Sequence, residues 1–222
     1  MKEWETSDAM FRELNGARIP YVILRNFEEL DAANFYISGH ADIDFLTTNG
    51  KQLSRIIGGK PRFIDDDGIH YVVKIAGTDV VIDTRSVGDG YYDTNWEKDV
   101  LKKRLLFRER FYIPDDENYY HTLSYHAILQ KKALSGDYLT RLNRMASDLG
   151  IAAGTESEHL AELERYMKHH GYHYTLPYDI HVPLRRECID QTMVKKYQKV
   201  ILRDAKIKAM QIGSDLKHKI IK

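Results

Sequence analysis

The segment Asp42-Ile43-Asp44 carries two aspartates separated by one residue. On a β-strand, residues i and i+2 point to the same face of the sheet, so the two carboxylates would lie close together. Two adjacent like charges repel each other unless a cation lies between them. Oxygen ligands of this kind suit a hard ion such as Mg²⁺ or Mn²⁺, which also binds phosphate oxygens of a substrate. The spacing alone leaves a solvent-facing strand edge as the alternative.

Asp83 is a third candidate, because it is a charged residue at the end of the apolar run Val80-Val81-Ile82 in a predicted strand. If its strand lies beside the strand of Asp42 and Asp44, the three acids form a cluster able to hold one or two metal ions. One of the three acids would then help to deprotonate an acceptor hydroxyl, and Asp83 is the first candidate for this role. The alternative is a surface residue paired with Arg85.

The first part of the chain predicts the elements that position these acids. Charged and apolar residues alternate over 42–47, which is typical of a strand. Pro20 precedes a second run of strand formers, and Asn49 is placed to cap a helix. Before residue 93 we therefore expect a helix over 4–15, strands over 21–24 and 42–47, a helix over 49–57, and an antiparallel hairpin of strands 69–76 and 80–84.

From Trp96 onward the residues are mainly helix formers, punctuated by Gly136, Gly150 and Gly171. The predicted helices cover 96–106, 118–134, 138–149 and 158–169, with one extended piece over 107–113. We expect an α/β (α+β) fold with two regions. Residues 1–93 would form a mixed sheet with helices, and residues 94–222 a helical region packed on that core.

Other residues could contact a ligand beside the acids. His40 precedes the acid pair in a glycine-containing loop, where it could lie over a bound phosphate. Lys74 is an isolated charge within the first hairpin strand and could reach a phosphate. The alternative for each residue is a side chain that points to solvent. The loop after the third acid contains Gly88, Asp89 and Tyr91, and its glycines allow close backbone approach while its tyrosines can stack on a base or sugar. We interpret His126 as a buried, hydrogen-bonded residue rather than a catalytic one.

Composition excludes several classes of protein. Hydrophobic residues make up 43% of the 222 residues and charged residues 30%, so disorder is not the main state. The longest apolar runs, such as Tyr21–Leu24, are far shorter than the ~18 residues that span a bilayer. The acidic start, Met1–Glu5, is not typical of a secretory signal, and the single cysteine, Cys188, fits a reducing compartment. We expect a cytoplasmic protein without a membrane span.

Basic residues are concentrated at the C-terminal end, where residues 195–222 are rich in lysine although the whole chain has a net charge of +0. Apolar residues recur every three or four positions in this segment, which predicts an amphipathic helix docked on its own domain with a solvated lysine face. Aromatic residues of the kind that stack on single strands are missing from it. Nucleic acid is therefore the less favoured partner.

The order of a strand, a strand with paired acids and a later strand with a third acid resembles the nucleotidyltransferase superfamily, which has a polymerase-beta-like core. The chain is more closely similar to uncharacterised nucleotidyltransferase-like proteins associated with cell-surface polysaccharide synthesis, and more distantly to the fukutin-like and phosphorylcholine-transferase families. The resemblance covers about residues 15–140 and is carried by the runs Val22–Asn26, Ala41–Leu46, Val87–Asp93, Trp96–Asp99 and Leu123–Ala127.

This resemblance implies a nucleotidyltransferase-like mixed sheet and a Mg²⁺- or Mn²⁺-dependent transfer on an activated phosphate, with Asp42, Asp44 and Asp83 matching the metal-binding acids of the superfamily. Members usually carry a Gly-Gly or Gly-Ser pair ahead of these acids, whereas this chain has Arg25 and Asn26 there. The planar fork of Arg25 can bind phosphate instead, and Asn26 can add a donor.

We therefore expect a transferase that uses a nucleotide or a nucleotide-activated small molecule as donor, with nucleotidyl or phosphoryl-alcohol transfer to a glycan or alcohol acceptor. Surface glycan synthesis is the process that the resemblance suggests. A metal-dependent glycosyltransferase that uses a nucleotide sugar would have the same acid spacing. A catalytically silent nucleotide-binding or scaffold domain is the alternative from another class, since a shared fold does not establish activity.

Overall fold

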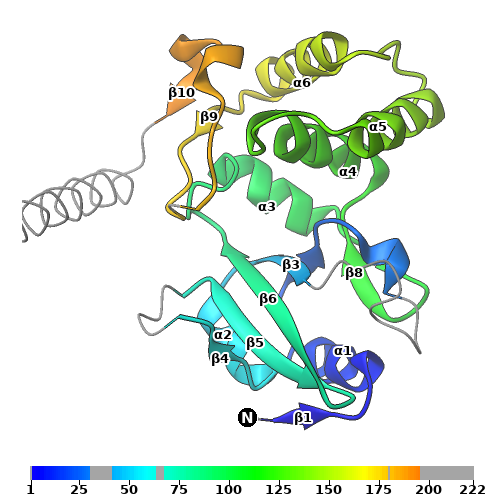
Figure 1. Cartoon of the computed structure of the whole chain (residues 1–222), viewed down its shortest axis with the longest axis vertical. Helices are drawn as coiled ribbons and strands as arrows, with labels where there is room; N and C mark the ends of the chain where they lie inside the picture. The colour runs from blue at the N-terminus through cyan, green and yellow to red at the C-terminus, as the bar shows by residue number, and fades with distance from the viewer. Residues whose placement is uncertain (1, 31–41, 64–67, 180, 196–222) are drawn as a thin grey trace, which may run out of the picture.

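The computed structural model describes residues 2–30, 42–63, 68–179 and 181–195. These residues form a mixed α/β fold, as the sequence predicts, with a six-stranded sheet at one end and a layer of helices at the other (Figure 1). His40 and nearly all of the predicted C-terminal amphipathic helix lie outside the described residues.

The main sheet has the strand order β1-β5-β6-β3-β2, and β4 pairs with the part of β5 that β1 does not cover. Strands β5 and β6 form the predicted antiparallel hairpin, and β2 is antiparallel to β3. The central pair, β3 and β6, is parallel, which requires the chain between them to cross over. The strands are β1 (Glu3–Trp4), β2 (Tyr21–Ile23), β3 (Asp42–Thr47), β4 (Lys60–Pro61), β5 (His70–Ile75) and β6 (Thr78–Ser86).

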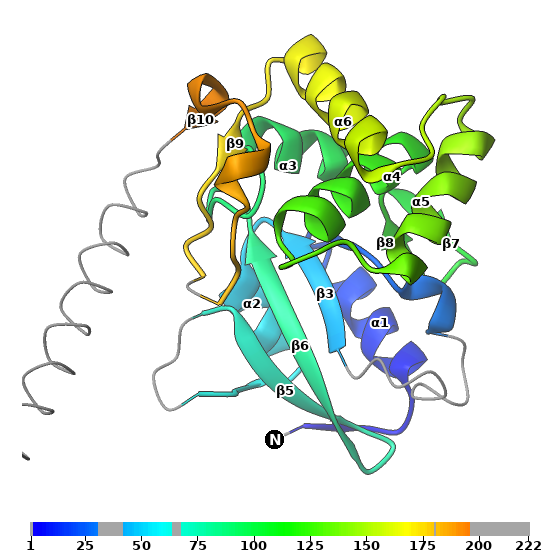
Figure 2. The same cartoon turned by 45° about the horizontal axis from the view of Figure 1, so that its top comes forward.

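Two helices lie on one face of this sheet, α1 (Ser7–Gly16) and α2 (Gly50–Ile56), as Figure 2 shows. The Asn49 side chain caps α2 by accepting from the backbone N–H of Gln52, as expected from its position. The first helix begins later than predicted, because Thr6 caps it and Trp4 belongs to β1 instead. The Trp4 indole donates to the Ile57 carbonyl at 2.8 Å and so ties this edge strand to the end of α2.

The two faces of the sheet have different neighbours because side chains alternate along each strand. Ile43, Phe45 and Ile82 point toward α1 and α2 and are buried with Phe11 and Leu14. The opposite face carries the acids Asp42, Asp44 and Asp83, together with apolar residues of β2 and β3 that pack against the helical half of the chain.

The second half is largely helical, as predicted, but its elements differ in detail. The predicted helix 118–134 runs as α4 only to Ser124 and continues as a π-helix, Tyr125–Leu129. Thr122 and Ser124 donate from their hydroxyls to carbonyls four residues earlier, a bonding pattern that bends helices. The remaining helices are α3 (Thr94–Lys102), α4 (Asp116–Ser124), α5 (Gly136–Asp148) and α6 (Glu156–His170).

The predicted extended piece over 107–113 is a small hairpin, in which β7 (Leu105–Phe107) turns back into β8 (Phe111–Ile113). Arg108 and Glu109 form the turn, and both have positive φ. Farther on, β9 (Tyr174–Thr175) pairs in parallel with β10 (Val194–Lys195), and the segment between them contains two short 3₁₀ turns, Arg186–Cys188 and Gln191–Met193.

The apolar cores extend across residue 93, the boundary proposed from the sequence. Phe111, Ile113 and Tyr119 are buried in the cluster beneath α1 and α2. Conversely, Val22 and Leu46, which belong to the sheet, pack with residues of the helical half. The two regions therefore share buried apolar surface.

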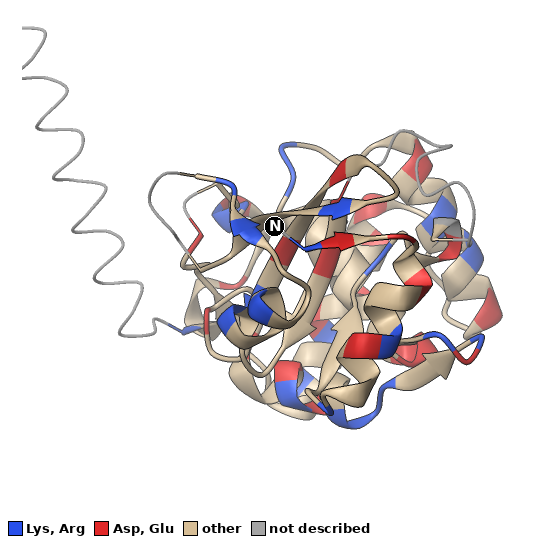
Figure 3. Ribbon diagram, turned by 90° about the horizontal axis from the view of Figure 1, so that it is seen from below, with Lys and Arg blue, Asp and Glu red and all other residues tan. Residues whose placement is uncertain are grey.

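Acidic and basic residues are interspersed over the elements visible in Figure 3. Within the described ranges, the helices are all too short or too polar to cross a membrane.

Gly90 provides a test of how the C-terminal segment packs on the sheet half. It has φ +80°, and an added Cβ would lie 2.6 Å from the Leu176 carbonyl oxygen. We expect Gly90→Ala to lower the free energy of unfolding by about 3 kcal/mol or more, because it combines a steric clash with left-handed backbone strain. Urea unfolding followed by circular dichroism measures this loss.

Gly77 is the matched control, since it has φ +78° and open space around its Cα. Gly77→Ala should cost only the backbone strain, about 1 kcal/mol. Equal losses in the two variants would contradict the close approach at Leu176.

Candidate functional site

The three predicted acids share one face of the sheet. In the parallel pair of β3 and β6, Asp44 is in register with Asp83, and Asp42 is in register with Val81. Residues in register on neighbouring strands point to the same side, so Asp83 lies beside Asp44 rather than on the opposite face. Asp42 is exposed, Asp44 is buried, and Asp83 lies between these extremes. This acid face is the geometric core of the candidate site.

Asp83 is the acid of this face whose pKa is clearly raised. Its burial and the negative charge of Asp44 raise its pKa to about 6, although Arg85 and His70 oppose the shift. One of its carboxylate oxygens, Oδ1, is buried and has no hydrogen-bond partner among the described residues. The Arg85 pair that the sequence offered as the alternative does form, with 3.1 Å between Arg85 Nη2 and Asp83 Oδ2. That pair is inside the protein, so Asp83 has the partner that the alternative named but not the surface position.

Arg25 neutralises Asp44. The backbone N–H of Leu24 donates to the Asp44 carbonyl, which brings the next residue, Arg25, beside the Asp44 side chain. The distance from Arg25 Nη2 to Asp44 Oδ1 is 2.8 Å, and only 7% and 5% of the two side chains is exposed. Burial alone would lower the pKa of Arg25, but the facing carboxylate holds it well above its ordinary value. Arg25 therefore lies at the site, as predicted, but its guanidinium binds a carboxylate of the protein itself.

A chain of buried polar groups continues from Arg25 into the helical half. Arg25 donates to the Tyr91 hydroxyl at 3.0 Å, and that hydroxyl lies 3.2 Å from His126 Nδ1. The side chain of Gln130 completes the chain by donating to the Tyr91 carbonyl at 3.0 Å. Burial and the charge of Arg25 keep the pKa of His126 well below its ordinary value, so its ring is neutral at pH 7. His126 is thus buried and hydrogen-bonded, as the sequence predicts.

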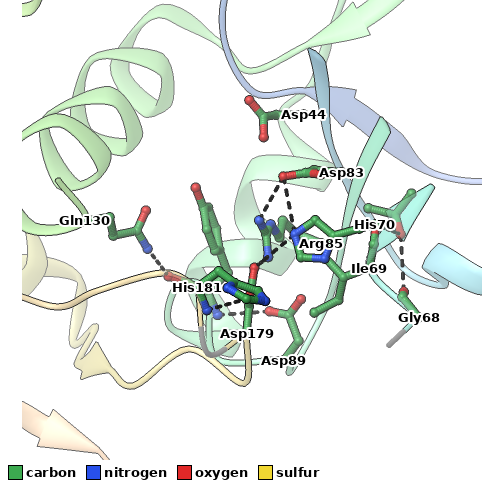
Figure 4. Close-up of polar contacts among 12 residues, drawn as sticks. Asp44, Gly68, Ile69, His70, Asp83, Arg85, Asp89, Gln130, Asp179 and His181 are labelled. Carbon is green, nitrogen blue, oxygen red and sulfur yellow. Dashed lines mark hydrogen bonds and ion pairs between the residues drawn. The ribbon is translucent and has the colours of Figure 1, made fainter. Parts of the chain in front are cut away.

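A second charged network joins the acid face to the C-terminal segment (Figure 4). Arg85 Nη1 lies 2.7 Å from Asp179 Oδ2, and His70 Nε2 lies 3.3 Å from the same oxygen. His70 Nε2 is also 3.8 Å from Asp83. Burial favours protonation of Asp179, but the contacts with His70 and Arg85 prevail and hold its pKa well below its ordinary value. Asp179 is therefore ionised, with the Arg85 guanidinium and the His70 ring beside its carboxylate.

The loop that contains Gly88, Asp89 and Tyr91 is held by internal hydrogen bonds. The buried Glu97 accepts from the backbone N–H of Gly88 at 2.7 Å, and Asp89 accepts from the N–H of Ser86 and of Tyr91. Tyr91 is 1% exposed and lies against the guanidinium of Arg85, 4.6 Å from ring centroid to Cζ. The predicted ring for stacking on a substrate is thus buried, and its hydroxyl orients Arg25 instead.

The two remaining predicted ligand-binding residues have neighbours other than the three acids. Asn26 has a left-handed backbone, and its side chain accepts from Arg141 of α5 at 2.9 Å. Lys74 is on β5 opposite Asp79, four residues along the strand from His70, which faces Asp83. The structure therefore places Arg25 beside Asp44 and Tyr91 beside Arg25. Gly88 and Asp89 lie in the loop after β6, Asn26 lies beyond the end of β2, and Lys74 lies toward the hairpin turn.

Sequence reasoning missed His70 and Asp179 as members of the site. Strand parity offered a signal for Arg85, which follows Asp83 by two residues and so shares its face. His70 is the first residue of β5 and reaches Asp83 only through the hairpin register. Asp179 lies in an irregular segment between β9 and the first 3₁₀ turn, and its position relative to Asp83 depends on the tertiary fold.

The acid face has the right ligand types for a hard metal ion, but it is not a preformed metal cage. Among the described residues, no group of three or more His, Cys, Asp or Glu side chains is arranged to hold a metal ion. Asp83 supplies a carboxylate oxygen without a hydrogen bond to another described residue, and Asp42 adds an exposed carboxylate on the same face. Mg²⁺ is commonly held by one or two carboxylates together with water and substrate phosphates, and these residues suit that mode.

The ion pair of Arg25 and Asp44 can be tested by removing one charge. Asp44→Asn leaves the Arg25 guanidinium buried opposite a neutral group, so we expect the free energy of unfolding to fall by about 3–5 kcal/mol. Chemical denaturation at pH 7 measures the change. Replacing both residues, with Arg25→Met and Asp44→Leu, should cost less than Asp44→Asn alone.

The control is the exposed pair of Lys2 and Glu13, which are 3.5 Å apart. Glu13→Gln should cost less than about 1 kcal/mol, since solvent screens exposed charges. A loss of similar size in Glu13→Gln and Asp44→Asn would show that Arg25 finds another partner.

Asp83 gives a prediction with a definite pH dependence. Because folding raises its pKa from 3.8 to about 6, the folded state binds the proton more tightly, and the stability contributed by protonated Asp83 is lost as pH rises from about 4 to above 6. Asp83→Asn should therefore gain about 2 kcal/mol relative to the native chain between pH 4.5 and pH 7.5. Denaturant titrations at both pH values measure this difference.

Asp79 lies on the same strand at an exposed position, so Asp79→Asn gives the baseline for removing one negative charge. If the Asp83→Asn variant gains no more stability between the two pH values than Asp79→Asn does, Asp83 is not the carboxylate with the raised pKa.

Compared with models of protein families, with curated proteins and with solved structures, the chain gives no match. A functional conclusion therefore depends on the chemistry of the acid face and the buried charges around it.

Proposed function

We propose that this chain is a metal-dependent transferase that acts on a nucleotide-activated phosphate donor. The observation that carries this proposal is the in-register pair of Asp44 and Asp83 on parallel neighbouring strands, in which Asp83 has a raised pKa and a buried oxygen without a hydrogen-bond partner among the described residues. A strongly perturbed carboxylate of this kind is more common at functional sites than elsewhere.

The proposed metal is Mg²⁺ or Mn²⁺, held by Asp83 with Asp42 or Asp44 and completed by water and the phosphates of the donor. When bound, such an ion supplies positive charge that stabilises the phosphoryl group during transfer. A cation is favoured on the acid face, since burial and the like charge of Asp44 both disfavour the ionised form of Asp83 and raise its pKa. A site completed by substrate also accounts for the lack of a three-ligand cage within the described residues.

The acceptor in this proposal is a glycan or alcohol hydroxyl. A carboxylate with a pKa of about 6 is ionised at neutral pH and still basic enough to take part of a proton from the attacking hydroxyl. Asp83 is the residue we assign to this role, and Arg85 at 3.1 Å orients its other oxygen. Because Cys188 is the only cysteine, we also propose that the reaction takes place in a reducing compartment, the cytoplasm.

One contact favours the alternative of a catalytically silent domain. Arg25 already neutralises Asp44, at 2.8 Å, in the position that a metal ion would occupy in an acid pair. If this ion pair persists in the presence of metal and nucleotide, the acid face serves as structural support only. A measurement of metal binding therefore distinguishes a catalytic site from a catalytically silent domain.

The test is a calorimetric titration of the folded protein with Mn²⁺ and a panel of nucleoside triphosphates and nucleotide sugars. We expect a nucleotide to bind only when Mn²⁺ is present, and Asp83→Asn to weaken that binding by about tenfold or more, since it removes the negative charge of the proposed metal ligand. Lys74→Gln is the control, because Lys74 lies toward the hairpin turn. Transfer from nucleotide sugars alone, with release of a nucleoside diphosphate, would assign the chain to glycosyl transfer instead.

Two outcomes would refute the proposal. Equal affinity for the nucleotide with and without Mn²⁺ would show that nucleotide binding does not depend on the metal. Equal affinities of the native chain and Asp83→Asn, with both folded, would show that the acid face does not contact the ligand.

A further inference from the structure

Arg85 and His70 converge on a single carboxylate oxygen. Arg85 Nη1 and His70 Nε2 lie 2.7 Å and 3.3 Å from Asp179 Oδ2. The arginine comes from β6, the histidine from β5, and the aspartate from the irregular segment after β9, as the close-up in Figure 4 shows. Two donors from a rigid hairpin thus surround an anion that comes from a different part of the chain.

The arginine has more hydrogen-bonding capacity than its present partners use. Its side chain is 4% exposed, and its Nε is buried without a hydrogen-bond partner among the described residues. The guanidinium stays charged at all relevant pH values and presents a planar fork that matches a phosphate as well as it matches a carboxylate. A buried arginine with an unused donor is therefore suited to an anion with more acceptor oxygens than Asp179 offers.

The segment that carries Asp179 borders a groove of about 390 Å³, lined by Leu176, Pro177, His181 to Leu184 and Lys132. Lys132 adds an exposed positive charge to this groove. The backbone N–H of Tyr178 donates to the Asp89 carbonyl at 2.8 Å, so the segment is held against the loop after β6 directly beside Asp179. An anion bound in the groove would therefore lie against the same segment of the chain that carries Asp179.

We propose that Arg85 and His70 form a phosphoryl-binding site, and that the Asp179 carboxylate occupies this site until a phosphoryl group of the ligand displaces it. This inference rests on the proposed transferase function, for which it names the residues that hold the phosphate. It also assigns to Asp179 the role of an intramolecular competitor, so that the apparent affinity for the ligand is the intrinsic affinity multiplied by the fraction of time that Asp179 leaves the site free.

The first test is a calorimetric titration with inorganic pyrophosphate in the presence of EDTA, so that no metal contributes. We expect Asp179→Asn to bind pyrophosphate about tenfold more tightly than the native chain, because the competing anion is gone. Asp190→Asn removes the same charge from a residue of the same segment that caps a 3₁₀ turn, and it should leave the affinity unchanged. Arg85→Gln, combined with Asp179→Asn, should abolish the gain.

The second test uses the native chain and does not depend on the folding of a variant. Displacement of Asp179 should loosen the hydrogen bond from Tyr178 N–H to the Asp89 carbonyl, so we expect hydrogen exchange of the Tyr178 amide to accelerate at saturating pyrophosphate. Exchange of the Gly88 amide, which donates to Glu97, is the internal control and should not change.

The inference fails if Asp179→Asn is folded and binds pyrophosphate no more tightly than Asp190→Asn does. It also fails if pyrophosphate binds the native chain while the Tyr178 amide remains equally protected, or if metal-free pyrophosphate does not bind at all. Each of these results leaves Mn²⁺-dependent nucleotide binding to be decided by the Asp83→Asn titration, so the two proposals can fail separately.

Discussion

The parallel register between β3 and β6 is the constraint from which most of the polar interior follows. It places Asp44 directly beside Asp83 on one face of the sheet, where burial and then the repulsion between the two carboxylates raise the pKa of Asp83. Such a pair is costly in a buried sheet unless cations compensate it. The protein supplies two arginines for this purpose, Arg25 from the end of β2 and Arg85 from β6 itself.

Those arginines in turn require anions and acceptors, and the helical half of the chain provides them. Arg25 donates to the Tyr91 hydroxyl, which leads on to His126 in the π-helix, while Arg85 is paired with Asp179 from the C-terminal segment. Buried polar groups must be hydrogen-bonded or paired to be tolerated. The charges on the sheet therefore determine where the helical half contacts it, together with the apolar core that Val22 and Leu46 share with that half.

The same compensation bears on function, because not all of the charge is satisfied. Asp83 keeps one buried oxygen, and Arg85 keeps its Nε, without a hydrogen-bond partner among the described residues. Unsatisfied buried groups of opposite charge on adjacent side chains are unusual in a purely structural network, since each costs free energy. A ligand that carries both a cation and a phosphate would satisfy both, which connects the proposed metal at Asp83 with the proposed phosphoryl site at Arg85 and His70.

The sequence by itself determined the local elements. The alternation over 42–47 predicted β3 with its observed bounds, Asn49 predicted the cap of α2, and the hairpin of β5 and β6 followed from its short turn. These features depend on neighbouring residues, so a single sequence contains them. The tertiary structure alone decided that β3 pairs with β6 in register, that Arg25 binds Asp44 rather than lying open to a ligand, and that Asp179 reaches Arg85, 94 residues away. Such contacts join segments that are distant in the chain, so no local sequence pattern encodes them.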